Sequence, residues 1–270
     1  MKKFSFSTTM LWVGLVFLYA PMLILIIYSF NDSKLVTVWG GFSIKWYFEL
    51  FKDQQILDAV WVSLQIAFYS ASMAVIIGTM AAFVMTRFRR SWAKLTLSNM
   101  ITAPLVMPEV ITGLSLMLLF VHMADLIGWP LERGRMTIWI AHSTFCAAYV
   151  AVVVSSRLRE LDMSIEEAAM DLGAGPFKTF MQITVPMITP ALVAGWLLSF
   201  SLSLDDLVIA SFASGPGATT LPMVVFSSVR LGVSPKINAL ATLIILVVAI
   251  IAFISWYMAV RADKKLKMTP

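Results

Sequence analysis

Residues 157–190 read RLRELDMSIEEAAMDLGAGPFKTFMQITVPMITP and form a polar stretch between two long apolar runs. We call this stretch the polar segment. Ser164 and Glu167 have the S-x-x-E spacing of a capping box, which predicts that a helix begins at Ser164 with Glu167 as its capping partner. The apolar positions recur at i, i+3, i+4 and i+7 and define one face of that helix: Ile165, Ala168, Ala169 and Leu172.

A turn and a second short helix are predicted after the first. Gly173 and Gly175 can end the first helix, and Pro176 can occupy the first position of the second. A sharp turn there favours φ > 0, which glycine at position 173 adopts readily. The second helix has an apolar stripe before Pro186: Phe177, Phe180, Met181 and Val185. The polar segment is therefore predicted to be a helix-turn-helix outside the bilayer, too short and too charged to cross it.

The polar segment resembles a loop of known spacing. Permease subunits of binding-protein-dependent ABC importers have a cytoplasmic loop written E-A-A-x3-G-x9-I-x-L-P. This sequence has Glu167-Ala168-Ala169, Gly173, Ile183 and Val185-Pro186 at that spacing, with Val in place of Leu. The alternative, an ordinary amphipathic loop between two membrane helices, does not explain the glycine and proline positions together.

The composition indicates a membrane protein. The chain has 270 residues, of which 60% are hydrophobic and 13% charged, and its mean hydropathy is +0.87. Soluble domains are about half apolar and a quarter charged. The net charge of +5 is gathered in loops on one side of the membrane, so we expect no nucleic-acid partner. One cysteine and two histidines offer no disulfide and little material for a metal site.

Six apolar stretches are long enough to cross a bilayer, which takes about 20 residues: about 10–30, 59–86, 99–124, 137–156, 188–212 and 238–260. The first is too long for a secretory signal and has no small-residue cleavage site. Pro104 and Pro108 can kink the third span or make it start late. The aromatic residues in 31–58 predict an interfacial belt or a short helix lying on the membrane, or a contact with an extracytoplasmic partner, and a helix against the outer face is expected in 213–237. The sequence predicts one transmembrane domain over residues 1–270, all-α and polytopic.

The basic residues predict the orientation of the spans. The termini and the loops on their side have 13 of the 20 lysines and arginines, and the opposite loops have 7. Positive charge is enriched in cytoplasmic loops. Both termini and the polar segment are therefore predicted to be cytoplasmic.

The sequence shows no apparatus for catalysis. It contains no G-x-x-x-x-G-K-[ST], G-x-S-x-G or H-E-x-x-H motif, so we expect that the chain is not an enzyme and has no catalytic residue, no metal and no cofactor. If ATP drives transport, another polypeptide must hydrolyse it. In the importers that the chain resembles, the first helix of the loop docks in a groove of the ATPase subunit. The resemblance implies that the coupling positions are Glu167, Ala168, Ala169 and Gly173, with Ile165 and Leu172 on the same helix.

Acidic residues in a predicted span are the candidates for substrate chemistry. Asp205 and Asp206 lie within the fifth predicted span, where each charge costs about 2.5–3.5 kcal/mol near the helix centre. One can face a pathway while the other caps a helix or meets a partner subunit, or both can be a solvated pair at a helix end. Glu109 follows Pro108 and either complements a helix N-terminus or lies deeper and faces a cavity. Ser203 either shares the face of Asp205 or bonds to its own helix. His142 is expected to form a hydrogen bond between helices rather than bind a ligand.

Two further stretches, ITAPLVMPEVITGLSL and SLDDLVIASFASGPGATTLPMVVFSSVRLGVSPKINALATL, resemble permease subunits of polyamine ABC importers, as does most of the chain. The resemblance implies the type I importer fold and putrescine as the substrate. It also implies a homologous second permease, two ATPase subunits that bind ATP and Mg, and a periplasmic polyamine-binding protein, all at a bacterial inner membrane. The positions that match the polyamine pathway are Glu109, Ser203, Asp205, Asp206 and Trp46. Spermidine, another delivered solute, or a stand-alone secondary transporter are the alternatives.

Overall fold

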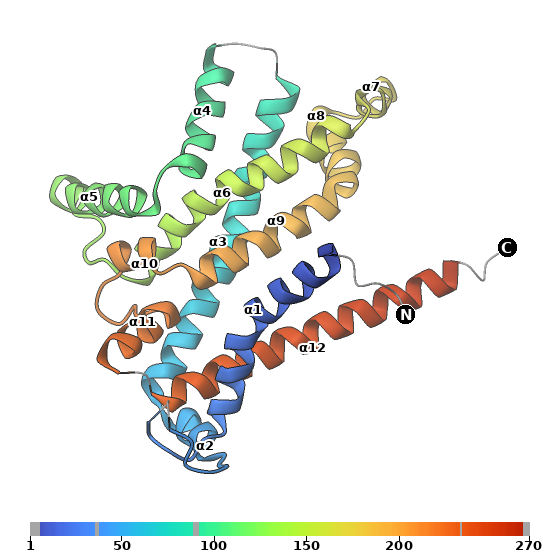
Figure 1. The fold of residues 1–270 in the computed structure, drawn as a ribbon. Helices are drawn as coiled ribbons and strands as arrows, with labels where there is room; N and C mark the ends of the chain where they lie inside the picture. Colours follow the sequence, from blue (N-terminus) through green and yellow to red (C-terminus); the bar gives the residue numbers. More distant parts are fainter. Residues whose placement is uncertain (1–5, 36–37, 89–91, 233, 267–270) are drawn as a thin grey trace. The chain divides into compact units, whose positions relative to one another are not determined.

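The computed structural model describes residues 6–35, 38–88, 92–232 and 234–266, and in these ranges the regular structure is helical (Figure 1). The predicted all-α class is thereby confirmed. The chain groups into two compact units, Met1–Leu57 with Val225–Pro270, and Asp58–Val224. The prediction of a single domain for the whole chain stays a prediction. The ends of the chain, with several of the basic residues that predict its orientation, lie outside the described residues.

The first unit contains three complete helices: α1 (Phe6–Ser29), α2 (Lys45–Lys52) and α12 (Pro235–Leu266). α12 packs against both α1 and α2. Asn31 organises the loop between α1 and α2, because its side chain bonds to the backbone of Val38 at 2.7 Å and of Gly40 at 2.7 Å. The Trp46 indole donates a 2.6 Å hydrogen bond to the Asn31 carbonyl and is buried. The short helix expected in 31–58 is thus present as α2.

The second unit is built around α6 (Arg135–Glu160), whose small and β-branched residues are buried along most of its length. α9 (Val185–Asp205) packs along α6. α3 (Gln54–Arg87), which begins in the first unit, approaches α6 closely at Gly78. A Cβ at Gly78 would lie 2.6 Å from the Val150 Cβ, so only glycine permits this approach. Further helices complete the unit: α4 (Trp92–Val106), α5 (Glu109–Ile127) and α10 (Val208–Ala213). The expected outer helix in 213–237 is α11 (Leu221–Leu231), which runs from this unit into the other.

Six helices in the described ranges are long and apolar enough to span a membrane, as the sequence predicts: Phe6–Ser29, Gln54–Arg87, Glu109–Ile127, Arg135–Glu160, Pro176–Asp205 and Pro235–Ile254. Two predicted spans have wrong bounds. The third begins at Glu109 because Pro108 interrupts the backbone hydrogen bonds, and α4 before it is a separate helix. The fifth ends at Asp205 instead of continuing to 212, and it begins at Pro176 instead of 188.

The polar segment is not an independent helix-turn-helix. Its first helix is α7 (Met163–Asp171). Its second helix, α8 (Pro176–Thr179), continues without a break through a π-helical turn, η1 (Phe180–Thr184), into α9. The chain stays helical past Pro186, which lies one residue after the start of α9.

Candidate functional site

The helix α7 begins at a different cap from the predicted one. Asp162 is the N-cap, and its Oδ1 accepts a 3.0 Å hydrogen bond from the Ser164 amide. The hydrogen bonds from Ser164 lower the pKa of the Asp162 carboxyl below its ordinary value. The predicted capping box of Ser164 and Glu167 is therefore wrong. The Asp162 carboxylate, two residues before Ser164, is the group that accepts from a free backbone amide in the first turn of α7. Glu167 is left exposed to solvent.

The turn after α7 is as predicted. Gly173 has φ +89°, and the Gly173 and Ala174 amides donate to the carbonyls of Met170 and Ala169 at 2.9 and 3.1 Å. These two bonds define a Schellman motif, which places the glycine at the position that needs φ > 0. Pro176 occupies the first position of α8. The turn therefore fixes the direction in which the chain leaves α7.

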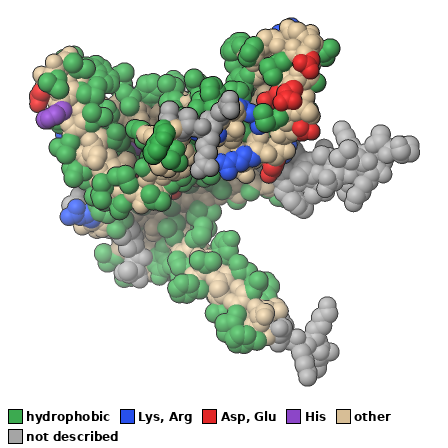
Figure 2. Space-filling view, turned by 90° about the horizontal axis from the view of Figure 1, so that it is seen from above, with side chains coloured by type: hydrophobic (Ala, Val, Ile, Leu, Met, Phe, Trp, Pro, Cys, Tyr) green, Lys and Arg blue, Asp and Glu red, His purple; other side chains and the backbone are tan. Residues whose placement is uncertain are grey.

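The outer surface of α7 presents apolar and acidic side chains together. Of the predicted docking face, Ile165, Ala168 and Leu172 are exposed, with Leu172 at 90%, and Ala169 is half-buried. Figure 2 shows acidic side chains gathered over this part of the molecule; the exposed ones there include Glu167 and Asp171. An exposed apolar patch edged by charge is typical of a protein interaction surface. The coupling roles of Glu167, Ala168, Ala169, Gly173, Ile165 and Leu172 stay predictions.

The inner side of α7 carries an interaction that the sequence did not reveal. The Arg87 guanidinium, at the end of α3, donates to both Glu166 carboxylate oxygens at 3.1 and 3.0 Å. The Thr184 hydroxyl, at the end of η1, donates to the same carboxylate at 3.0 Å. Arg87 and Glu166 are separated by 79 positions in the sequence, and no local spacing could have paired them.

A second candidate site lies where α9 ends. Asp205 is the last residue of α9, and α10 begins at Val208. Both oxygens of the Asp206 carboxylate accept from the Ile209 amide, at 2.9 and 3.1 Å. The pair is therefore not inside a continuous helix, which corrects one expectation. The expectation that one of the two carboxylates caps a helix is confirmed. Asp206, at the start of α10, accepts from the Ile209 amide, which has no carbonyl partner within the helix.

His142 links α6 to this break. Its Nδ1 is hydrogen-bonded to the Ser203 Oγ at 2.7 Å, and its Nε2 lies 3.6 Å from the Asp206 Oδ2, which is too long for a hydrogen bond. The imidazole is 1% exposed. The predicted hydrogen bond between helices is confirmed for His142. Ser203 takes His142 as its partner, so the alternative in which its hydroxyl bonds to its own helix is wrong.

Glu109 lies at the N-terminus of α5, so of the two alternatives the one that pairs it with a helix N-terminus is confirmed. One turn later, Gly113 meets α10: a Cβ there would lie 2.7 Å from the Phe212 ring and 3.3 Å from the Ile209 Cα. Residues four apart share a helix face, so Glu109 lies on the face of α5 that packs against α10. The structure thereby gathers Glu109, Ser203, Asp205 and Asp206 around one helix break. Trp46 belongs to the first unit, and the pathway roles of all five stay predictions.

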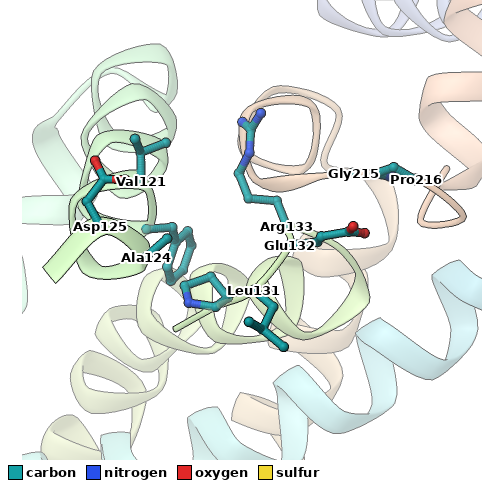
Figure 3. Close-up of a pocket in the computed structure, with 10 residues that line it drawn as sticks. Val121, Ala124, Asp125, Leu131, Glu132, Arg133, Gly215 and Pro216 are labelled. Atoms are coloured by element: carbon teal, nitrogen blue, oxygen red, sulfur yellow. The ribbon is translucent and has the colours of Figure 1, made fainter. Parts of the chain in front are cut away.

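A pocket of about 360 Å³ lies at the loops that follow α5 and α10 (Figure 3). Asp125 and Glu132 line it, and the Arg133 guanidinium donates to the Phe212 carbonyl at 3.0 Å. None of the predicted pathway residues lines this pocket. In the described part of the chain, no three metal-binding side chains come together.

Membrane-spanning helices, an exposed helix held against their ends and carboxylates at a break in a span indicate a solute permease. The chain belongs to the family of binding-protein-dependent transport system inner membrane components, whose model matches residues 74–268. It is 66% identical to the putrescine transport system permease protein PotI of Escherichia coli strain K12, over 94% of this chain and 91% of that protein. It is 39% identical to the spermidine/putrescine transport system permease protein PotC of the same strain, over 92% and 91%.

Solved structures share the fold at low sequence identity. A bacterial ABC transporter that imports alginate matches with a TM-score of 0.70 at 17% identity, over 95% of this chain and 94% of that one. The methionine ABC transporter MetNI matches with a TM-score of 0.60 at 16% identity, over 77% and 95%. The chain is thus a multi-pass inner-membrane permease with the fold of ABC importer permeases, and it is not an enzyme. Its family implies that a binding protein and an ATPase are separate partner chains.

Proposed function

We propose that this chain forms half of the translocation pathway of a putrescine importer. A homologous second permease forms the other half, two ATPase subunits bind ATP and Mg at the cytoplasmic face, and a periplasmic binding protein delivers the diamine. The observation that carries this proposal is the 66% identity to a putrescine permease along 94% of the chain. Both termini and the polar segment face the cytoplasm in this arrangement.

The chemistry of the helix break supports a cationic substrate. Asp205, Asp206 and Glu109 are carboxylates gathered near one end of α9, and a carboxylate inside a membrane is costly without a positive partner. A diamine brings two ammonium groups that can offset this cost as they pass. Asp205, Asp206, Glu109, Ser203 and Trp46 are the pathway residues of the proposal.

The exposed face of α7 supports coupling to an ATPase. Its apolar side chains can fill a groove, and Glu167 is free to pair with a cation of the partner. Under this proposal the chain supplies the docking helix, and the ATPase subunits alone bind ATP.

The proposal is tested by uptake of radiolabelled putrescine into vesicles that contain the coexpressed complex, with spermidine as competitor. Asp205→Asn and Asp206→Asn should each reduce uptake about tenfold or more, because a hydrogen bond to a charged group contributes about 1.5–3 kcal/mol. Asp125→Asn is the matched control, since this exposed carboxylate lies at the other end of α5. Unchanged uptake in both variants would reject the pathway residues, and a wild-type complex that imports spermidine but no putrescine would reject the substrate.

A further inference from the structure

The Glu166 side chain of α7 contacts the permease's own helices, whereas the neighbouring side chain of Ile165, in the predicted docking face, is exposed. The Glu166 carboxylate accepts hydrogen bonds from Arg87 and Thr184, and its side chain is 13% exposed, against 9% for Arg87. Both oxygens of Glu166 pair with the guanidinium, which is the strong, directional form of this interaction. The neighbouring residue Glu167 is exposed, because adjacent residues of a helix point about 100° apart, and so the two carboxylates have different surroundings.

The three side chains join three different elements. Arg87 is the last residue of α3, Glu166 lies in the first turn of α7, and Thr184 ends the π-helical turn η1. An ion pair that is largely shielded from solvent resists separation, because removing one partner leaves the other charge shielded and unpaired. Displacement of α7 must therefore move the ends of α3 and α9, or break this pair.

A displacement of α7 would reach α9 at the π-helical turn η1. π-turns inside helices are rare and are frequent at functional sites, because one extra residue weakens the local hydrogen-bond pattern. Thr184 is 1% exposed and is followed directly by α9, whose other end holds Ser203 and Asp205. Figure 1 shows α7 and α10 at opposite ends of α9, within the same unit. One continuous helix thus connects the Glu166 contact to the acidic break.

We propose that Glu166 is a positioning residue that transmits movement of α7 to the spans, through Arg87 to α3 and through Thr184 to α9. This inference rests on the proposed docking of an ATPase on α7. It assigns different work to two neighbouring residues: Glu167 faces the ATPase, and Glu166 holds α7 to the permease's own helices.

The test compares Glu166→Gln with Glu160→Gln in the reconstituted complex. Glu160 pairs with Arg157 at 2.9 Å, but this pair is exposed, with side chains 62% and 43% accessible, so its loss should change nothing. For each variant we would measure assembly with the ATPase, basal ATP hydrolysis, hydrolysis stimulated by the loaded binding protein, and putrescine imported per ATP. Glu166→Gln should assemble and keep basal hydrolysis, while import per ATP falls roughly 2- to 30-fold, the range for mutations in coupling networks.

Two further variants extend the test, and the first of them keeps the inference falsifiable if Glu166→Gln fails to assemble. Thr184→Val retains the ion pair and removes only the contact to η1, and it should also lower import per ATP. Arg87→Gln combined with Glu166→Gln should cost no more than either alone, because both remove the same contact. Import per ATP that is unchanged in Glu166→Gln or Thr184→Val, or equally reduced in Glu160→Gln, would overturn the inference.

Failure of the proposed function is separate from failure of this inference. A wild-type complex that imports no putrescine rejects the substrate, and one that never retains an ATPase rejects the docking. The role of Glu166 is judged by import per ATP in the variant relative to the wild type, measured with whichever solute the wild-type complex imports.

Discussion

Replacement of Gly173 by alanine isolates the energetic cost of the turn that ends α7. Gly173 has φ +89°, and a Cβ added there would meet no atom within 4 Å. The penalty therefore comes from the local backbone conformation and not from contacts with other parts of the chain. A left-handed backbone costs an L-residue about 1–2 kcal/mol. Because 1.4 kcal/mol is about a factor of ten, local opening of α7 should become about 5- to 30-fold more frequent.

The assay is hydrogen exchange of the α7 amides in nanodiscs, where the exchange rate reports the population of the open form. Gly173→Ala should accelerate exchange by that factor. Gly173→Asn should accelerate it less, because asparagine tolerates the left-handed region. Gly175→Ser is the matched control: it adds a Cβ into open space two residues away, at φ −68°, where serine is a favoured N-cap.

Equal exchange rates in Gly173→Ala and Gly175→Ser would refute the reasoning, since they would show that the sign of φ at position 173 does not limit α7. The same variants test the connection to coupling. If a formed α7 is needed for docking, retention of the ATPase by Gly173→Ala should fall by no more than the fraction of α7 that opens.

Three other substitutions have expected outcomes. Gly78→Ala should lower the thermal midpoint of unfolding in detergent, because overpacking costs about 1–3 kcal/mol. Gly14→Ala, with no atom within 4 Å of its Cβ, should leave the midpoint unchanged or raise it. Equal midpoints for the two variants would contradict the close approach of α3 to α6 at Gly78. Asp206→Ala should destabilise α10 by about 1 kcal/mol through loss of its bond to the Ile209 amide, while Asp206→Asn retains an acceptor and should be milder; chemical denaturation compares the two. Because hydrogen bonds from the backbone lower the pKa of Asp162, its stabilisation of α7 should be full above the ordinary value of 3.8 and be lost as the pH falls through the lower folded value. Asp162→Ala should remove this pH dependence of hydrogen exchange, and an unaltered profile would exclude the cap.

Local chemistry in the sequence was enough to predict much of the fold. Apolar runs of about 20 residues predicted six spans, because the thickness of the bilayer sets that length regardless of the packing between helices. The turn at Gly173 and Pro176 was predictable for the same reason: each residue restricts its own φ, whatever surrounds it. The family was also readable, because its loop motif lies within about twenty consecutive residues.

Features that depend on competition between local alternatives were predicted less well. The capping box predicted Ser164 as the cap of α7, whereas in the structure the Asp162 carboxylate is the cap and accepts a hydrogen bond from the Ser164 amide. The fifth span looked continuous from its composition, yet Asp206 ends it by capping α10. In both cases hydropathy and spacing allow either outcome, and the bonding of single amides decides between them.

The sequence by itself determined that this chain is an all-helical membrane permease and predicted a short docking helix, since span length, turn residues and a short motif are local properties. Only the tertiary structure decided which side chains act together. Arg87 meets Glu166 and His142 meets Ser203 because packed helices bring distant positions within 3 Å or so, and no periodicity along the chain encodes such pairs. The sequence therefore predicts that the polar segment is a surface for a partner. The contacts that attach this segment to the spans can be seen only in the folded protein.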